Sequence, residues 1–184
     1  MGLIGVSLLA TAAAGCGSAS TGPQAANNDI SAGLRAQLSG DLATAQTDYM
    51  NAIHADGTSS LAYYDLGTVY DAQGNHQQAA SEYQAAININ PNYADALYNL
   101  AVDTAASNPS NAEQLYRQVV ADQPNYAAAW LNLGFLLMAE GKNDEARADW
   151  QKAVMLQPSL ASRLPAGALS PAPSASASPS PSAH

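Results

Sequence analysis

Two stretches of this sequence nearly repeat each other: PNYADALYNLA at residues 91–101 and PNYAAAWLNLG at residues 124–134. Seven of the eleven positions are identical, and the two stretches begin 33 residues apart. The differing positions include pairs of similar residue type, such as the small residues Ala101 in the first stretch and Gly134 in the second. A fixed internal period of this length indicates an array of similar structural units, and it takes precedence over local patterns in assigning the fold.

The same spacing of large, small and turn residues continues on both sides of these stretches. Within each copy, apolar residues recur every three or four positions, as they do on one face of a helix. Three copies match in register, and their residues are Tyr63, Leu66, Gly67, Tyr70, Gly74, Ala79, Tyr83, Ala86 and Pro91, then Leu97, Leu100, Ala101, Thr104, Ala112, Tyr116, Val119 and Pro124, then Trp130, Leu133, Gly134, Leu137, Gly141, Ala146, Trp150, Ala153 and Pro158. An earlier, weaker copy keeps Gly33, Gly40, Ala45, Tyr49 and Ala52.

This pattern resembles the tetratricopeptide repeat, a unit of about 34 residues folded as two antiparallel helices. The resemblance implies an all-α fold, an α-solenoid of about four helical hairpins. Small residues let the two helices cross closely, and the closing proline ends the second helix. We predict a repeat domain at residues 27–160, divided into a degenerate repeat at 27–59 and repeats at 60–93, 94–126 and 127–160. The alternative is an unrelated Ala-rich helical bundle.

The composition argues against several functional classes. The 184 residues carry 15 acidic and 6 basic side chains, a formal net charge of −9, and such a surface repels nucleic-acid phosphates and anionic headgroups. The three histidines, His54, His76 and His184, have no second His or Cys at ligand spacing, and His76 is expected to be a solvated residue near a turn. With no phosphate loop or nucleophile motif, we expect no enzyme, no cofactor, no metal and no nucleic-acid partner.

The first twenty residues, MGLIGVSLLATAAAGCGSAS, have the order of a secretory signal, an apolar stretch followed by small residues. The run Ala13-Ala14-Gly15-Cys16 resembles a bacterial lipobox, in which cleavage precedes the cysteine and the cysteine carries lipid. The resemblance implies a lipoprotein-type signal peptide at residues 1–15, lipidation at Cys16, secretion across the bacterial inner membrane and a membrane anchor. Since Met1-Gly2 lacks the positive charge usual in signal peptides, an ordinary cleaved signal or a buried apolar N-terminus is the alternative.

Two segments of low complexity flank the repeats. Residues 16–26 are small and polar and are expected to form a flexible tether. Residues 161–184 are rich in Pro, Ala and Ser and are expected to be a disordered tail, because this composition cannot build a core.

The resemblance also implies a binding surface. In tetratricopeptide proteins the first helix of each repeat lines a concave groove that binds peptides. Carried over to this sequence, the groove residues are Tyr64, Asp65, Thr68, Asp71, Asp95, Tyr98, Asn99, Val102, Leu131, Asn132, Phe135 and Met138. The amides of Asn99 and Asn132 can bond an extended peptide backbone in this family; the alternative is that both are consensus residues without a ligand.

The charge of these helices indicates which peptides would fit. Apart from Arg35 in the weak first repeat they carry no Lys or Arg, and Asp65, Asp71 and Asp95 favour a neutral or basic extended segment. We therefore expect an envelope-located adaptor that binds a protein or peptide partner. The alternative is an architectural or self-associating envelope component that uses the convex face or the C-terminal end.

The C-terminal end of the array is short of a full capping helix. Six residues, Ser159 to Leu164, separate Pro158 from Pro165, too few for a stable free helix. Leu156, Leu160 and Leu164 are expected to fold back as a partial cap. If they do not, the last repeat stays open and weak self-association through this end is expected.

Overall fold

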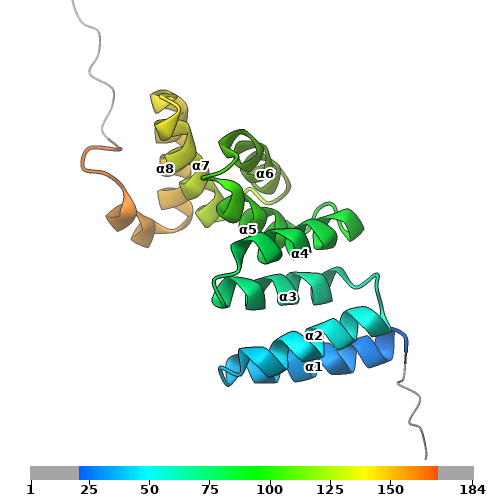
Figure 1. The fold of residues 1–184 in the computed structure, drawn as a ribbon. Coiled ribbons are helices and arrows are strands. Elements are labelled where there is room, and N and C mark those ends of the chain that lie inside the picture. Colours follow the sequence, from blue (N-terminus) through cyan, green and yellow to red (C-terminus); the bar gives the residue numbers. More distant parts are fainter. Residues whose placement is uncertain (1–20, 170–184) are drawn as a thin grey trace, which may run out of the picture.

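The computed structural model describes residues 21–169, which form an α-solenoid without β-strands (Figure 1). Its elements are α1 (Pro23–Leu38), α2 (Leu42–Ala55), α3 (Ser60–Ala72), α4 (His76–Ile89), α5 (Ala94–Thr104), α6 (Pro109–Asp122), α7 (Ala127–Ala139), α8 (Asn143–Leu156) and a 3₁₀ turn, η1 (Pro158–Arg163). Consecutive helices pair as four hairpins, and each hairpin packs mainly on the next along the chain.

The helices begin and end where the local sequence supplies caps. The side chains of Asp41, Ser59 and Asn108 accept hydrogen bonds from backbone N–H groups in the first turns of α2, α3 and α6. Between α3 and α4 the chain turns through Gly74, whose φ of +79° is one that a side chain disfavours. The third hairpin turns instead through Asn108 and Pro109, and proline fits the first helical position because its missing N–H has no partner there.

The core is a column of large side chains, one from the second helix of each hairpin. Tyr49, Tyr83, Tyr116 and Trp150 are buried in it. In the first, second and fourth hairpins the ring lies directly against a glycine of the first helix: Gly33, Gly67 and Gly134 respectively. The small and large positions that define the repeat in the sequence are therefore the positions where the two helices of a hairpin touch.

Helix α1 begins earlier than the sequence analysis placed the repeats. It starts at Pro23, inside the segment 16–26 expected to be a tether. Ala26 is buried in the core of the first hairpins, and the N–H of Gly22 donates to the carbonyl of Ala55 at 2.9 Å. These contacts order residues that composition alone assigned to a linker.

The chain also continues in ordered form past Pro158. Leu160 is 6 % exposed and packs with Leu131 and Trp150, and Leu164 packs against the same cluster. The partial cap is thus confirmed for Leu160 and Leu164, but Leu156 is exposed and takes no part. The segment 161–184, expected to be disordered, is ordered as far as residue 169 because these leucines bury apolar surface.

Residues 1–20 and 170–184 lie outside the described residues, and with them the predicted signal peptide and Cys16. Within residues 21–169, no helix combines the length and the apolar character that crossing a membrane requires.

Candidate functional site

Two clusters of three tyrosines lie beside the first helices of the two central hairpins, one beside α3 and one beside α5. Tyr64 of α3 packs against Tyr83 and Tyr93, with ring centroids 5.8 and 5.0 Å apart. The second cluster repeats this arrangement one hairpin later, with Tyr98 against Tyr116 at 5.9 Å and against Tyr126 at 5.1 Å. Tilted aromatic pairs at such distances add to the stabilisation from burial alone.

The third tyrosine of each cluster comes from the repeated PNY motif. Tyr93 and Tyr126 stand just before α5 and α7, so each joins its own hairpin to the preceding one. The hydroxyl of Tyr126 also donates to Asp95 Oδ1 at 2.9 Å. These two tyrosines were not among the predicted site residues, although their identity in both copies was the available signal.

The predicted asparagines lie against these clusters. The Nδ2 of Asn132 donates to the hydroxyls of Tyr98 at 3.0 Å and Tyr116 at 3.4 Å. Asn99 occupies the same place one repeat earlier, within hydrogen-bonding reach of the hydroxyls of Tyr64 and Tyr83. Asn132 is therefore held by tyrosines of the preceding hairpin, and Asn99 is placed to be held in the same way.

An open cleft of about 410 Å³ lies between α5 and α7, and we call it the groove. Its lining is mostly apolar and consists of Val102, Ala105, Ala106, Tyr116, Asn132, Phe135, Leu136 and Ala139. The structure thus brings together three of the predicted residues, Val102, Asn132 and Phe135. Val102 is 46 % exposed although it is apolar, so its side chain is available to a partner.

Two other predicted residues, Thr68 and Met138, do not line the groove. Thr68 is half-buried, and its Oγ1 donates to the carbonyl of Asp65 and accepts from Gln37. Met138 is exposed on α7 but does not line the groove.

The prediction that Leu131 lines the groove surface is wrong. Leu131 is fully buried and packs with Trp150, Ala153 and Leu160. Its carbonyl accepts a hydrogen bond from Trp150 Nε1 at 3.2 Å. The physical reason is the C-terminal turn: η1 packs mainly on α8, and its Leu160 covers Leu131 of α7, a position that the family pattern leaves open.

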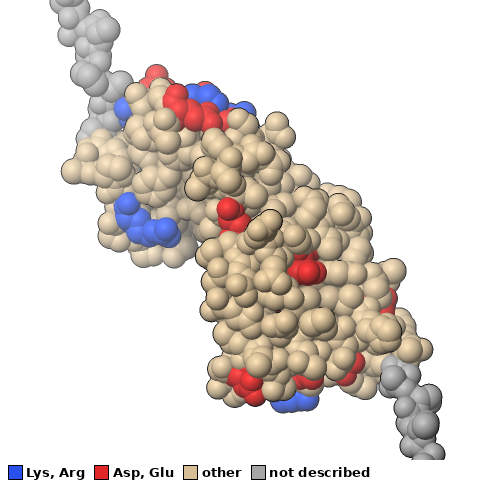
Figure 2. Space-filling model, in the orientation of Figure 1, with Lys and Arg blue, Asp and Glu red and all other residues tan. Residues whose placement is uncertain are grey.

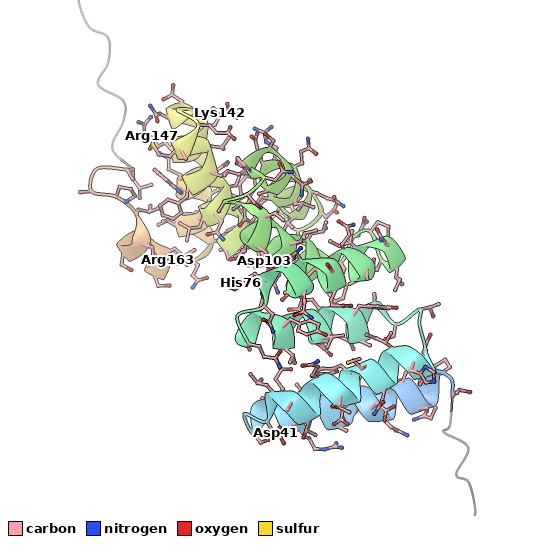
Figure 3. All side chains as sticks on the ribbon, viewed as in Figure 1. Asp41, His76, Asp103, Lys142, Arg147 and Arg163 are labelled. Atoms are coloured by element: carbon pink, nitrogen blue, oxygen red, sulfur yellow. The ribbon has the colours of Figure 1, made fainter. Side chains whose placement is uncertain are left out.

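Few charged groups lie around the tyrosine clusters, and burial changes the pKa of one of them. Burial raises the pKa of Asp65 to about 6, while Asp95 is exposed and accepts from Tyr126. Burial also raises the pKa of Tyr98, an effect that the hydrogen bond from Asn132 and the nearby positive charge of Arg163 partly oppose. Figure 2 shows a face with scattered charges and a basic spot where Figure 3 labels Arg163. This cation comes from η1, outside the helices on which the sequence analysis based its charge argument.

Asp71, a predicted groove residue, belongs to a different cluster. Its Oδ2 accepts from the hydroxyl of Tyr83 at 2.6 Å, and its Oδ1 lies 3.1 Å from His76 Nδ1. Asp103 also reaches His76, so the three side chains offer ligating atoms close enough to share a metal ion. His76, expected from the sequence to be a solvated residue near a turn, lies in this cluster. Asp103 was not among the predicted site residues, because only the fold brings it in from the next hairpin.

Comparisons with known proteins agree with this architecture. Family models of the tetratricopeptide repeat match residues 60–93 and 104–148. The photosystem I assembly protein Ycf3 of Cyanophora paradoxa is 27% identical over 129 residues, which cover 68% of this chain and 64% of that protein. Its counterpart in Acaryochloris marina is 32% identical over 73 residues, which cover 38% of this chain and 44% of that protein. The chain therefore spans less than two thirds of the length of these curated relatives.

Solved structures share the fold. A crystal structure of MamA superposes with a TM-score of 0.67 at 25% identity, covering 74% of this chain and 81% of that one. The first TPR of Spaghetti (RPAP3), bound to the HSP90 peptide SRMEEVD, superposes with a TM-score of 0.63 at 20% identity, covering 66% of this chain and 98% of that one. Together with the family models and the stacked hairpins, these likenesses show that the chain contains tetratricopeptide repeats arranged as an α-solenoid.

Proposed function

We propose that this protein is an adaptor that binds an extended segment of a partner protein in the groove between α5 and α7. The observation that carries the proposal is the groove itself, an apolar cleft of about 410 Å³ with an oriented amide on its wall. Apolar walls with a few fixed polar groups are typical of binding sites, because the walls supply affinity and the polar groups supply orientation.

The orientation of Asn132 suggests how the site would recognise a peptide backbone. Its Nδ2 already donates hydrogen bonds to Tyr98 and Tyr116. Its Oδ1 is therefore the atom that would accept a hydrogen bond from a peptide N–H. Val102 and Phe135 would contact the apolar side chains of the same peptide. Preorganised polar groups lower the entropic cost of binding, since they need no reordering when the partner arrives.

Where the partner segment extends beyond the groove over α3 and α5, the charges support a neutral or basic sequence. The peptide in the Spaghetti (RPAP3) structure, SRMEEVD, is acidic, whereas this chain places Asp65 and Asp95 beside its tyrosine clusters. An acidic segment would be repelled there. Arg163 stands near Tyr98, so this preference applies to the α3–α5 part of the surface.

We further propose that the protein acts outside the cytoplasm, anchored through lipid at Cys16. The proposal is supported by the apolar N-terminal stretch and the Ala13-Ala14-Gly15-Cys16 pattern. Because α1 begins at Pro23, seven residues after Cys16, the first hairpin would lie within about 25 Å of the anchor even with an extended connection. The repeats would then meet their partners close to the membrane surface.

Cross-linking and pull-down from membranes, read by mass spectrometry, tests this function. The wild-type protein is compared with Asn99→Ala/Asn132→Ala and with Val102→Lys, which places a charge in the groove. A matched control, Asn88→Ala/Asn143→Ala, removes two exposed amides outside the groove. Circular dichroism establishes that each variant is folded.

Loss of the same partner in both groove variants, with the control unchanged, is the expected result. If the partners are retained in both, peptide binding in the groove is wrong. The architectural alternative would then gain support, with self-association through the end of α8, where Met155 is 74 % exposed. Recovery of the protein outside the membrane fraction would contradict the anchor.

A further inference from the structure

We propose that Asp71, His76 and Asp103 form a binding site for a divalent transition-metal ion, for which zinc is the best match, between the second and third hairpins. The site is separate from the groove and does not depend on the proposed function. It would join two repeats through a metal ion in addition to their side-chain packing.

The three ligands come from three different helices. Asp71 lies in the last turn of α3, His76 is the first residue of α4, and Asp103 lies near the end of α5. The tight turn through Gly74 folds α4 back so that His76 faces Asp71. Stacking of the third hairpin on the second then brings Asp103 to the same imidazole, and Figure 3 shows His76 and Asp103 side by side.

The distances from His76 to the two carboxylates are close to those between the ligands of one metal ion, and the three ligand atoms all lie within 4.8 Å of one another. His76 Nδ1 lies 3.1 Å from Asp71 Oδ1 and 3.4 Å from Asp103 Oδ1. Ligands bound to zinc at about 2.0–2.2 Å in a tetrahedron are roughly 3.3–3.6 Å apart. A metal ion would therefore need small side-chain movements to bind all three groups.

An unsatisfied carboxylate also indicates a missing cation. The side chain of Asp103 is 6 % exposed, and its Oδ2 has no hydrogen-bond partner among the described residues. One imidazole nitrogen carries at most one proton, so His76 cannot fully satisfy two carboxylates. A buried acceptor without a partner is costly, and a bound divalent ion would neutralise both acids at once.

The surroundings are those of an accessible, oriented site. The Tyr83 hydroxyl donates to Asp71 Oδ2 at 2.6 Å, which fixes this carboxylate from behind, as partners of metal ligands commonly do. The side chain of His76 is 66 % exposed, which leaves an entry path and room for water as a further ligand. One nitrogen and two oxygen donors favour zinc, cobalt or manganese over magnesium and calcium.

Calorimetric titration of the full chain tests the proposal. The protein is stripped with a chelator, exchanged into a buffer that does not bind metals, and titrated with zinc chloride and, separately, with magnesium chloride at neutral pH. The variants are His76→Ala and Asp103→Asn. His54→Ala, which removes the other histidine of the described residues, is the matched control.

We expect one zinc ion per chain in the wild type and in His54→Ala, and at least about tenfold weaker binding in His76→Ala and Asp103→Asn. Zinc should also raise the thermal midpoint of the wild type but not of His76→Ala, because ligands that bind the folded state stabilise it. Equal zinc affinity in His76→Ala and wild type, or no zinc binding by the wild type, would overturn the proposal. Magnesium binding as tight as zinc binding would overturn the assignment to a transition metal.

Discussion

In three of the four hairpins a glycine faces a large aromatic ring of the partner helix. A Cβ added to Gly134 would lie 2.5 Å from Trp150 Cδ1 and Nε1 and 3.0 Å from the carbonyl oxygen of Ala146. Neither neighbour can yield easily, since the ring is fully buried and the oxygen belongs to the backbone of α8. The glycine therefore sets the separation of the two helices.

We predict that Gly134→Ala lowers the free energy of unfolding by about 1–3 kcal/mol, the usual cost of overpacking a core. Urea denaturation followed by circular dichroism measures this change. Gly57→Ala is the matched control, because its new Cβ would meet a backbone oxygen at an ordinary 3.7 Å. The control should stay within about 0.5 kcal/mol of the wild type. Equal effects of the two substitutions would show that the contact with Trp150 does not limit the packing.

The repeat pattern predicted contacts inside a hairpin better than contacts between hairpins. The pairing of small residues with Tyr83 and Trp150 could be assigned from the period, because the same positions recur in each copy. The bond from Tyr126 to Asp95 and the approach of Asp103 to His76 could not. Each of these contacts uses at least one residue that differs from copy to copy, Asp95 in the first and His76 in the second, so the period carries no information about the pairing.

At the scale of elements, η1 shows how a short segment becomes ordered by packing. Its six residues are too few for a stable free helix, yet Leu160 and Leu164 bury apolar surface against the last hairpin. This cap could be expected from the leucine spacing, but Leu131, predicted to lie on the groove surface, is covered by Leu160 of η1. Family patterns describe the repeat itself and not the segment that follows it, which is why Leu131 was misassigned.

We predict that Leu160→Ala releases η1 from the last hairpin, α7 and α8. Leu-to-Ala changes at buried sites typically cost about 2–5 kcal/mol of stability. A six-residue turn has little other stabilisation, so this loss should detach it. Trp150, which is fully buried beneath this turn, should become accessible, so its fluorescence should shift to longer wavelength and be quenched by acrylamide. Leu156→Ala is the control at an exposed leucine and should leave the emission unchanged. Unchanged quenching in Leu160→Ala would show that η1 is held by other contacts.

On the scale of the whole molecule, acidity and burial act together on stability. The chain has a formal net charge of −9, and burial raises the pKa of Asp65, Asp103 and Asp149 to about 6. A carboxyl with a raised pKa binds its proton more tightly in the folded than in the unfolded chain. Its contribution is therefore favourable at low pH and is lost as pH rises from about 4 through about 6.

Other titratable groups also change how the folding stability depends on pH, each in the direction set by its pKa shift. The pKa of His76 is raised by its hydrogen bond to Asp71, so its contribution is also lost as pH rises. The pKa of Glu140 is lowered by the Lys142 ammonium, and the pKa of Asp41 is lowered by Thr44. Their contributions are lost below about pH 4, where these acids become protonated. Stability should then be greatest near pH 4 and decline toward pH 7.

We predict that Asp65→Asn removes part of this decline. In the presence of a chelator, which keeps the proposed metal site empty, the variant should be more stable than the wild type at pH 7 and similar to it near pH 4. The reason is that Asn mimics the protonated acid and needs no desolvation of charge. Thermal melts across this pH range measure the difference. Asp122→Asn changes the net charge equally at an exposed position, so it separates burial from general repulsion. If both variants flatten the pH profile to the same extent, the acidic net charge and not the buried Asp65 carboxyl governs stability.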